Sequence, residues 1–133
     1  MPVSFNPLLI AVSVNPLNRS YGMMISEGCF TVNVLGKEHA ELAQKLADRG
    51  DRFKGLSWSR SRLIGCPILD DALAHLECNI QSEYPAGDHQ LLVAEVITGS
   101  LRNPVAQPML YADTGNMDGS IALLPGQLSG GTE

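Results

Sequence analysis

Two apolar runs near the start of the chain indicate strands. Residues 8–14 read LLIAVSV, a continuous apolar run with β-branched members, which is typical of a strand that is buried on both faces. Residues 29–35 read CFTVNVL, where every second residue from Phe30 is apolar, as in a strand with one buried face. An Asn-Pro pair directly after the first run is expected to end that strand.

Helical spacing is found in two segments. Residues 19–27 follow Asn18, a favourable N-cap residue, and precede Gly28, which suits the left-handed position after a helix. Residues 38–49 place leucines and alanines four apart on one face, and Gly50 is expected to end this helix. We therefore expect one helix between the two strands and another after them.

Alternating apolar and polar residues return in residues 72–81 and 89–98, which flank a turn at residues 85–88. Within this expected antiparallel hairpin, Cys78 should face the core and Glu77 should face solvent. The total is about five strands and two helices, and the last three strands are consecutive. This order favours a mainly β fold with minor α content, in which helices flank an antiparallel sheet or small barrel, over a doubly wound parallel sheet.

Two further segments show no long periodic pattern. Residues 51–67 contain four basic residues and the only tryptophan of the chain, and we expect a long surface loop of the kind that often serves function. Residues 107–112 are expected to add a short strand. The following residues are rich in Gly and Ser, so we expect the end of this tail to be mobile.

Composition narrows the class of protein. With 133 residues, 44% of them hydrophobic, the chain fits one domain with its own core. A net charge of −5 with nine Lys and Arg argues against a nucleic-acid surface, and no apolar run approaches the ~18 residues of a membrane-spanning helix. Three cysteines without CxxC spacing favour neither a disulfide framework nor a structural metal site, and a reducing cytoplasm is expected.

No common catalytic signature is present: the sequence lacks GxSxG, HExxH, a P-loop and GxGxxG. If the protein is an enzyme, its reactive chemistry is therefore expected to come from a cofactor. Residues 13–21 are expected to contain the end of a strand and the beginning of a helix. A hydroxyl, a guanidinium and free backbone N–H groups meet at this helix start, and together they suit a phosphate. Ordinary capping beside a solvated Arg19 is the alternative, and spacing alone favours it. His89 follows Gly87 and Asp88 at the expected turn. It is either an exposed turn residue or a histidine that faces a ligand, and spacing alone favours the turn residue.

Six stretches of the chain form an ordered set. They read PVSFNPLLIAVSV, NRSYGMMISEGCFTVNVL, ELAQKLADRGDRFKG, GCPILDDALAHLECNI, GDHQLLVAEV and QPMLYADTG, from Pro2 to about Gly115. In order and rough spacing they resemble the flavin reductase-like family, and in particular its flavoredoxin branch. The GDH triplet after an ALAHLEC-type strand is the most specific part of this resemblance.

The resemblance implies a six-stranded antiparallel split β-barrel of Greek-key type, a homodimer, and FMN bound near the dimer interface. NADH or NADPH would supply the hydride, and reduced flavin would pass to a flavin-dependent monooxygenase or another electron acceptor. Family positions that contact FMN match Met1, Pro2, Val3, Ser13, Val14, Asn15 and Ser20. Arg19 is also expected to contact FMN, as a substitute for the basic residue that the family carries one position earlier. Ser20 matches a phosphate ligand, and His89 matches the histidine near flavin and nicotinamide and is the expected catalytic residue. Asp51, Arg52 and Phe53 match the family's D-K-F segment, where a structural loop closure is expected.

This chain also departs from the family pattern. Asn6-Pro7 replaces a usual Pro-Pro, and Asn18 stands where Arg or Lys is common, with Arg19 following. Family members carry one or two strands before the PVS segment, so the resemblance implies that the N-terminal strand or strands are missing here. We expect a flavin reductase-like domain over residues 1–115 and a tail over 116–133. An NAD(P)H-dependent FMN reductase is the leading hypothesis, and the alternatives are a non-catalytic FMN-binding electron carrier or a shortened domain that does not bind flavin.

Overall fold

The fold is known from a computed structural model that describes residues 1–47, 53–110 and 113. These residues form seven strands and two helices. The strands are β1 (Pro2–Phe5), β2 (Leu8–Val14), β3 (Cys29–Val34), β4 (Trp58–Arg60), β5 (Pro67–Leu69), β6 (Ala74–Ala86) and β7 (His89–Leu101). The helices are α1 (Arg19–Glu27) and α2 (Ala40–Ala47). The prediction of a mainly β fold with two helices is therefore confirmed.

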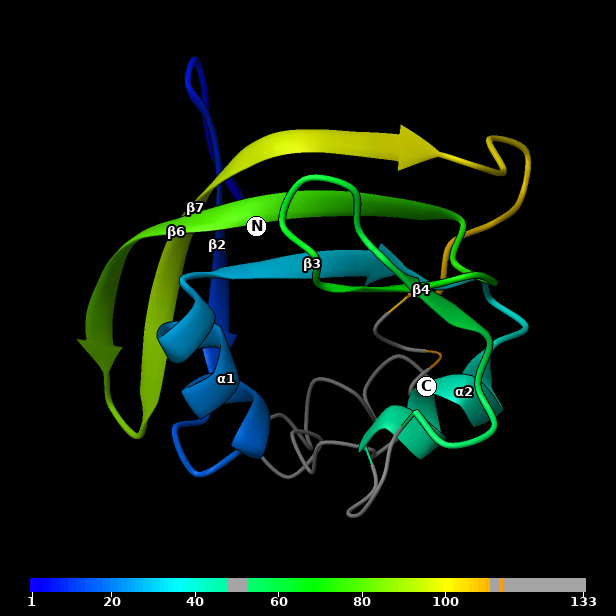
Figure 1. Ribbon diagram of the computed structural model, residues 1–133, viewed down its shortest axis with the longest axis horizontal. Helices are drawn as coiled ribbons and strands as arrows, with labels where there is room; N and C mark the ends of the chain where they lie inside the picture. Colours follow the sequence, from blue (N-terminus) through cyan, green and yellow to red (C-terminus); the bar gives the residue numbers. More distant parts are fainter. Residues whose placement is uncertain (48–52, 111–112, 114–133) are drawn as a thin grey trace, which may run out of the picture.

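An antiparallel five-stranded sheet with the order β1-β2-β7-β6-β3 forms the body of the protein (Figure 1). The β6–β7 hairpin lies between β2 and β3, an arrangement of the Greek-key kind. Both hairpin strands have 13 residues, more than predicted. β6 continues beyond residue 81 to Ala86, opposite His89, and β7 continues beyond residue 98 to Leu101, opposite Ala74. The turn is thereby shortened to Gly87 and Asp88, and the φ of 63° at Gly87 is one that glycine adopts readily.

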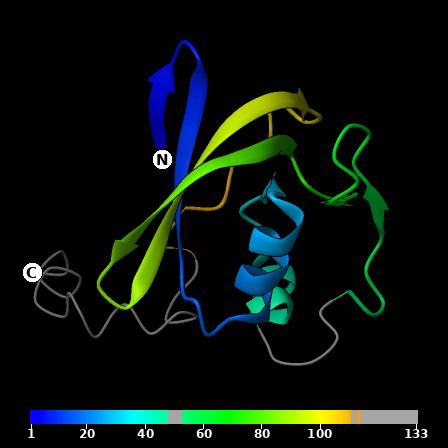
Figure 2. The ribbon, with the colours of Figure 1, turned by 60° about the vertical axis from the view of Figure 1, so that its left-hand side comes forward.

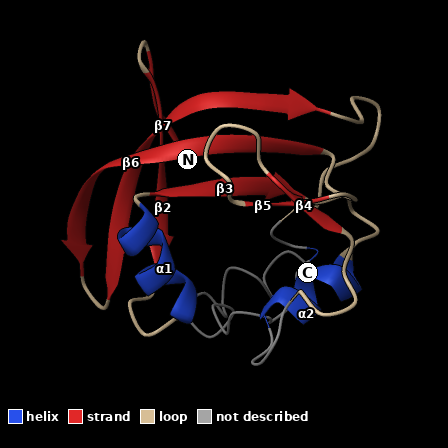
Figure 3. Cartoon of the chain, in the orientation of Figure 1, coloured by secondary structure: helices blue, strands red, loops and turns tan. Residues whose placement is uncertain are grey.

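Three short strands, β1, β4 and β5, were not predicted from the hydrophobic pattern. β1 is a four-residue edge strand that contains a proline, which sheet edges tolerate, and the β1–β2 hairpin projects from the body (Figures 1 and 2). β4 and β5 pair within and just beyond the expected loop, and each has three residues. Asn33 fastens β5 beside β3, because its Nδ2 donates to the carbonyl of Pro67 at 3.4 Å and its Oδ1 accepts the N–H of Leu69 at 2.9 Å (Figure 3).

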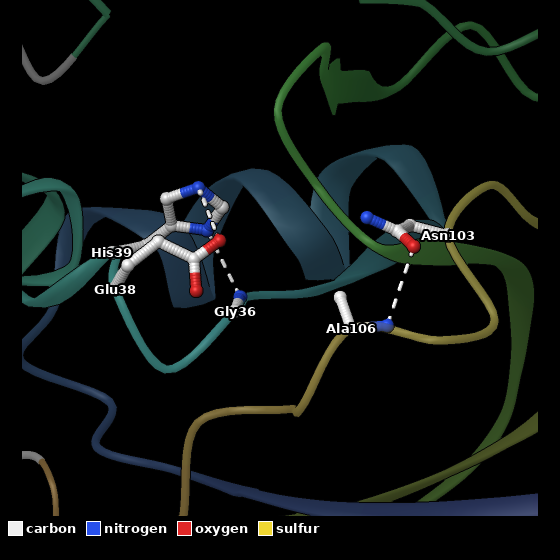
Figure 4. A network of polar contacts seen from close by, with 5 residues as sticks. All are labelled: Gly36, Glu38, His39, Asn103 and Ala106. Carbon is white, nitrogen blue, oxygen red and sulfur yellow. Dashed lines mark hydrogen bonds and ion pairs between the residues drawn. The ribbon is translucent and has the colours of Figure 1, made fainter.

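The two helices lie on the same side of β3 (Figures 1 and 2). α1 has the predicted bounds, and Gly28 adopts the predicted left-handed conformation with its N–H bonded to the carbonyl of Met24 at 2.8 Å. α2 begins two residues later than predicted, because His39 Nδ1 accepts the N–H of Gly36 at 2.9 Å and holds the preceding residues in a turn (Figure 4). The expected end of this helix, residues 48–50, lies outside the described residues.

The core lies on the face of the five-stranded sheet against which α1 packs. Phe30, Cys78 and Ala94 form its buried cluster, and Met24 of α1 packs against them. The predicted inward orientation of Cys78 is confirmed, since this residue is 0% exposed.

The prediction that Glu77 faces solvent is wrong. Its side chain was expected to face solvent, but the residue is only 2% exposed. The loop before β5 covers this face of β6, and Glu77 Oε1 accepts the N–H groups of Leu63 at 3.0 Å and Ile64 at 3.2 Å. The strand alternation was read correctly, but strand periodicity alone does not reveal that a distant loop covers the outer face.

The predicted strand at residues 107–112 is reduced to one isolated bridge between Gly36 and Pro108. A proline has no N–H to donate, so it cannot extend a ladder through its own position. Residues 111–112 of that strand and the expected tail, 116–133, lie outside the described residues. Within the described part of the chain, no helix has both the length and the apolar character needed to span a membrane.

Candidate functional site

The end of β2 and the beginning of β7 meet at one end of the sheet. Val14 is paired with Gln90, so His89 lies beside the last residue of β2 although 75 positions separate His89 from Val14 in the sequence. His89 is half-buried, and its Nδ1 lies 2.8 Å from Asp88 Oδ1. This hydrogen bond lowers the pKa of the Asp88 carboxyl. The carboxylate therefore holds the imidazole at the sheet end.

Asn15 forms the turn that leads from β2 to α1. Its Oδ1 accepts the N–H of Leu17 at 3.0 Å, and its carbonyl accepts the N–H of Asn18 at 3.0 Å. The prediction that Asn18 caps α1 is wrong for its side chain, which makes no capping hydrogen bond although the backbone has the extended cap conformation. The first turn of α1 contains no acidic side chain. Its N–H groups and positive dipole end therefore remain suited to an external anion.

A contact that the sequence pattern did not indicate holds α1 against the hairpin. The hydroxyl of Tyr21 donates to Glu83 Oε2 on β6 at 2.5 Å, across 62 positions. This hydrogen bond raises the pKa of Tyr21. Arg19, which is exposed, and Ser20, which is half-buried, directly precede Tyr21 in the helix. The start of α1 is thereby fixed relative to the same sheet end.

Met1, Pro2 and Val3 lie along the side of β2. The Met1 carbonyl accepts the N–H of Ala11 at 2.7 Å, and its ammonium group donates to the Ala11 carbonyl at 3.0 Å. From there β1 runs away from the end of β2, with Pro2 opposite Ile10. The expected site residues that the structure brings to the sheet end are Ser13, Val14, Asn15, Arg19, Ser20 and His89. Met1 lies nearby, whereas Pro2 and Val3 are farther along the hairpin.

The residues at this sheet end fit a flavin mononucleotide. Such a ligand needs an anion site, a polar backbone edge and apolar surface for its ring. The uncapped start of α1 with Arg19 and Ser20 suits the phosphate. Leu17, 91% exposed, offers apolar surface next to the turn that Asn15 forms. Asp51 and Arg52, which match the family's D-K-F segment, lie outside the described residues, so they are not used in judging whether the site fits FMN.

Comparison with known proteins places these features in a family. The family model for the flavin reductase like domain matches residues 1–120. The flavin reductase (NADH) of Kitasatospora aureofaciens is 33% identical over 111 residues, covering 82% of this chain and 58% of that protein. The reductase subunit HsaB of a flavin-dependent monooxygenase from Rhodococcus jostii is 34% identical over 95 residues, covering 71% of this chain and 48% of that protein.

A solved structure shows the same fold. The NADH:FAD oxidoreductase SgcE6 of Streptomyces globisporus C-1027 superposes with a TM-score of 0.79 at 30% identity, covering 85% of this chain and 69% of that one. The chain spans about half the length of the two curated relatives. Since the family model matches residues 1–120 and the fold agrees, the chain belongs to the flavin reductase like domain family.

Proposed function

We propose that this chain is a flavin reductase domain that binds FMN at the sheet end formed by β2, α1 and β7 and transfers a hydride to it from NADH or NADPH. The observation that carries the proposal is the pairing of Val14 with Gln90. It brings a helix start suited to a phosphate beside His89, the only histidine at this end of the described fold. Family membership and the reductase names of the relatives support the same function.

Each side chain at the sheet end has a defined part in this proposal. The N–H groups of the first turn of α1 and the Ser20 hydroxyl donate to the phosphate, and Arg19 offsets its charge. Asn15 fixes the turn that sets the helix start beside β2. A bound flavin supplies the two-electron chemistry that protein side chains lack. His89, oriented by Asp88, offers a ring N–H to the bound ligand.

The proposal also specifies which flavin is bound and which nicotinamide donates the hydride. We favour FMN because the residues at the sheet end account for one phosphate group. The similar SgcE6 is described as an NADH:FAD oxidoreductase, and the Kitasatospora aureofaciens relative as an NADH enzyme. FMN and FAD, and NADH and NADPH, should therefore all be tested.

The proposal also includes a homodimer that supplies reduced flavin to a monooxygenase in the cytoplasm. Apolar side chains of the β1–β2 hairpin are exposed, with Met1 at 71% and Phe5 at 86%, and exposed apolar patches of this kind are typical of protein interfaces. The Rhodococcus jostii relative is named as a monooxygenase reductase subunit. All three cysteines are free thiols, as a reducing compartment favours.

Two measurements on the purified chain test the function. FMN and FAD are first titrated into the protein while flavin fluorescence is followed, and quenching is expected with FMN. NADH and NADPH oxidation is then measured with the flavin bound. Binding with oxidation supports the reductase, binding without oxidation assigns an electron carrier instead, and absence of binding contradicts both.

A further inference from the structure

A cavity of about 700 Å³ lies far from the sheet end described above. It opens between the β4–β5 hairpin and the part of the sheet where β6 begins and β7 ends; Figure 3 shows these elements on the same side of the molecule. Its lining residues are Ser59, Arg60, Arg62, Leu63, Ile68, His75, Glu77, Thr98, Gly99, Ser100 and Arg102. The stretch of β7 from His89 to Gly99 corresponds to roughly 30 Å of extended strand at about 3.3 Å per residue, so this cavity is separate from the proposed flavin site.

Three guanidinium groups line the cavity. Arg60 Nη1 donates to the carbonyl of Gly65 at 3.0 Å, and Arg102 Nη1 donates to the carbonyl of Asp70 at 2.9 Å. Arg62 has no hydrogen-bond or ion-pair partner within the described residues. No carboxylate in the described part of the chain forms an ion pair with any of the three. Their charges are therefore not neutralised by neighbouring side chains there.

The single carboxylate in the cavity wall does not offset this charge fully. Glu77 Oε1 is engaged by the N–H groups of Leu63 and Ile64. Three arginines against one glutamate leave an excess of two positive charges at the cavity, in a chain whose net charge is −5. The excess is therefore a local concentration and not a reflection of the composition.

One residue of the cavity wall has a buried polar atom without a partner among the described residues. His75 lines the cavity, and its Nδ1 is buried without a hydrogen-bond partner in the described structure. Nearly all buried polar groups in proteins are hydrogen-bonded to protein, water or a ligand. The hydroxyls of Thr98 and Ser100 add further donors to the lining.

We propose that this cavity is a second ligand site, which binds a small molecule bearing a phosphate or diphosphate group. Arginine guanidinium groups bind phosphate oxygens through paired, charge-assisted hydrogen bonds. The volume lies within the range of small-molecule sites, about 300–1,000 Å³. The proposal goes beyond flavin reduction and does not depend on it, because it uses neither the sheet end nor a flavin.

Isothermal titration calorimetry with inorganic pyrophosphate at fixed ionic strength tests the site. Arg62→Gln removes the guanidinium without a described partner and is expected to weaken pyrophosphate binding about tenfold to a hundredfold, the effect of one lost charge-assisted contact. Lys37→Gln is the matched control, because it removes one positive charge from an exposed position outside the cavity. The control is expected to bind pyrophosphate as the wild type does.

Two further comparisons locate the site and its ligand. Saturation with FMN occupies the proposed phosphate site at the start of α1 and should leave pyrophosphate binding at the cavity intact. In the FMN-saturated protein the amide resonances of Leu63 and Ser100 should shift on titration while that of Ser20 does not. Tighter binding of adenosine diphosphate than of pyrophosphate assigns a nucleotide, and equal binding assigns the free diphosphate. Wild-type affinity in both Arg62→Gln and Arg102→Gln, or loss of all pyrophosphate binding once FMN saturates the protein, would overturn the proposal.

Discussion

Val14, the last residue of β2, lies opposite Gln90 near the start of β7. Because His89 directly precedes Gln90, this pairing places an imidazole beside the turn that Asn15 forms and the helix start that follows it. A strand from the beginning of the chain and a hairpin from its second half thus share one sheet end.

His89→Ala is expected to slow hydride transfer more than it weakens flavin binding. The rate of FMN reduction should fall roughly tenfold or more, the effect of losing one hydrogen bond to a charged group, whereas the dissociation constant for FMN should change less. The measurement is a comparison of steady-state rates with FMN titrations. Asp88→Asn is the control, because it removes the partner carboxylate but retains the imidazole. An unchanged rate in His89→Ala would leave the histidine as a turn residue.

Ser20→Ala is expected to weaken FMN binding by about 1–2 kcal/mol, because the hydroxyl donates to the phosphate in the proposed site. Fluorescence quenching of FMN gives the dissociation constant. Ser26→Ala is a matched control, since Ser26 lies in the last turn of the same helix and is exposed. Equal affinities in the two variants would remove Ser20 from the phosphate site.

The bounds of α1 were predictable because the signals for a helix are local. Met24 packs against the core, and Gly28 ends the helix at the expected position. The prediction that the Asn18 side chain caps this helix was wrong, because the side chain that forms the turn before the helix is that of Asn15. Local sequence thus specifies that a helix begins here but not which side chain completes its start.

The site was predictable only in part for a similar reason. The resemblance indicated the residues at the sheet end, but the bond from Tyr21 to Glu83 joins residues 62 positions apart and follows no periodic pattern. The same holds for the burial of Glu77, which depends on where residues 61–66 fold back over β6. Contacts between distant segments depend on the tertiary arrangement, so strand and helix periodicities do not reveal them.

The pKa of the buried Glu77 carboxyl lies below its ordinary value. Burial alone would raise this pKa, but hydrogen bonds from the Leu63 N–H, the Ser61 hydroxyl and the Ile64 N–H outweigh burial and lower it. A carboxyl whose pKa falls on folding stabilises the protein above the pKa of the unfolded chain, and this contribution is lost as the pH falls through the folded-state pKa. The free energy of unfolding of the wild type is therefore expected to decrease below about pH 5.

Glu77→Ala is expected to lower the free energy of unfolding at pH 7 by about 2–3 kcal/mol, because two loop N–H groups lose their acceptor. Glu77→Gln should remove the part of the pH dependence that this carboxyl contributes. Urea denaturation at neutral and acidic pH measures both effects. Asp71→Asn, at an exposed position of the same segment, should behave as the wild type. A Glu77→Gln variant with the full acid sensitivity of the wild type would contradict this role.

Phe5→Asp is expected to weaken the proposed homodimer. The side chain is 86% exposed in the single chain, and burying a phenylalanine contributes about 2 kcal/mol. A homodimer loses this side chain from both protomers, so the dimer dissociation constant should rise roughly a thousandfold. Val105→Asp is a matched control, because this residue is 90% exposed but lies outside the β1–β2 hairpin. Sedimentation equilibrium distinguishes the variants, and equal dissociation constants would exclude the hairpin from the interface.

The most direct test of the central claim is a single-turnover experiment without oxygen, in which the chain loaded with FMN is mixed with NADH or NADPH and the flavin absorbance is recorded. The account predicts that the oxidised flavin absorbance disappears as one equivalent of the nicotinamide donor is consumed, and that His89→Ala slows this change. A protein-bound flavin that stays oxidised with both donors would contradict a flavin reductase.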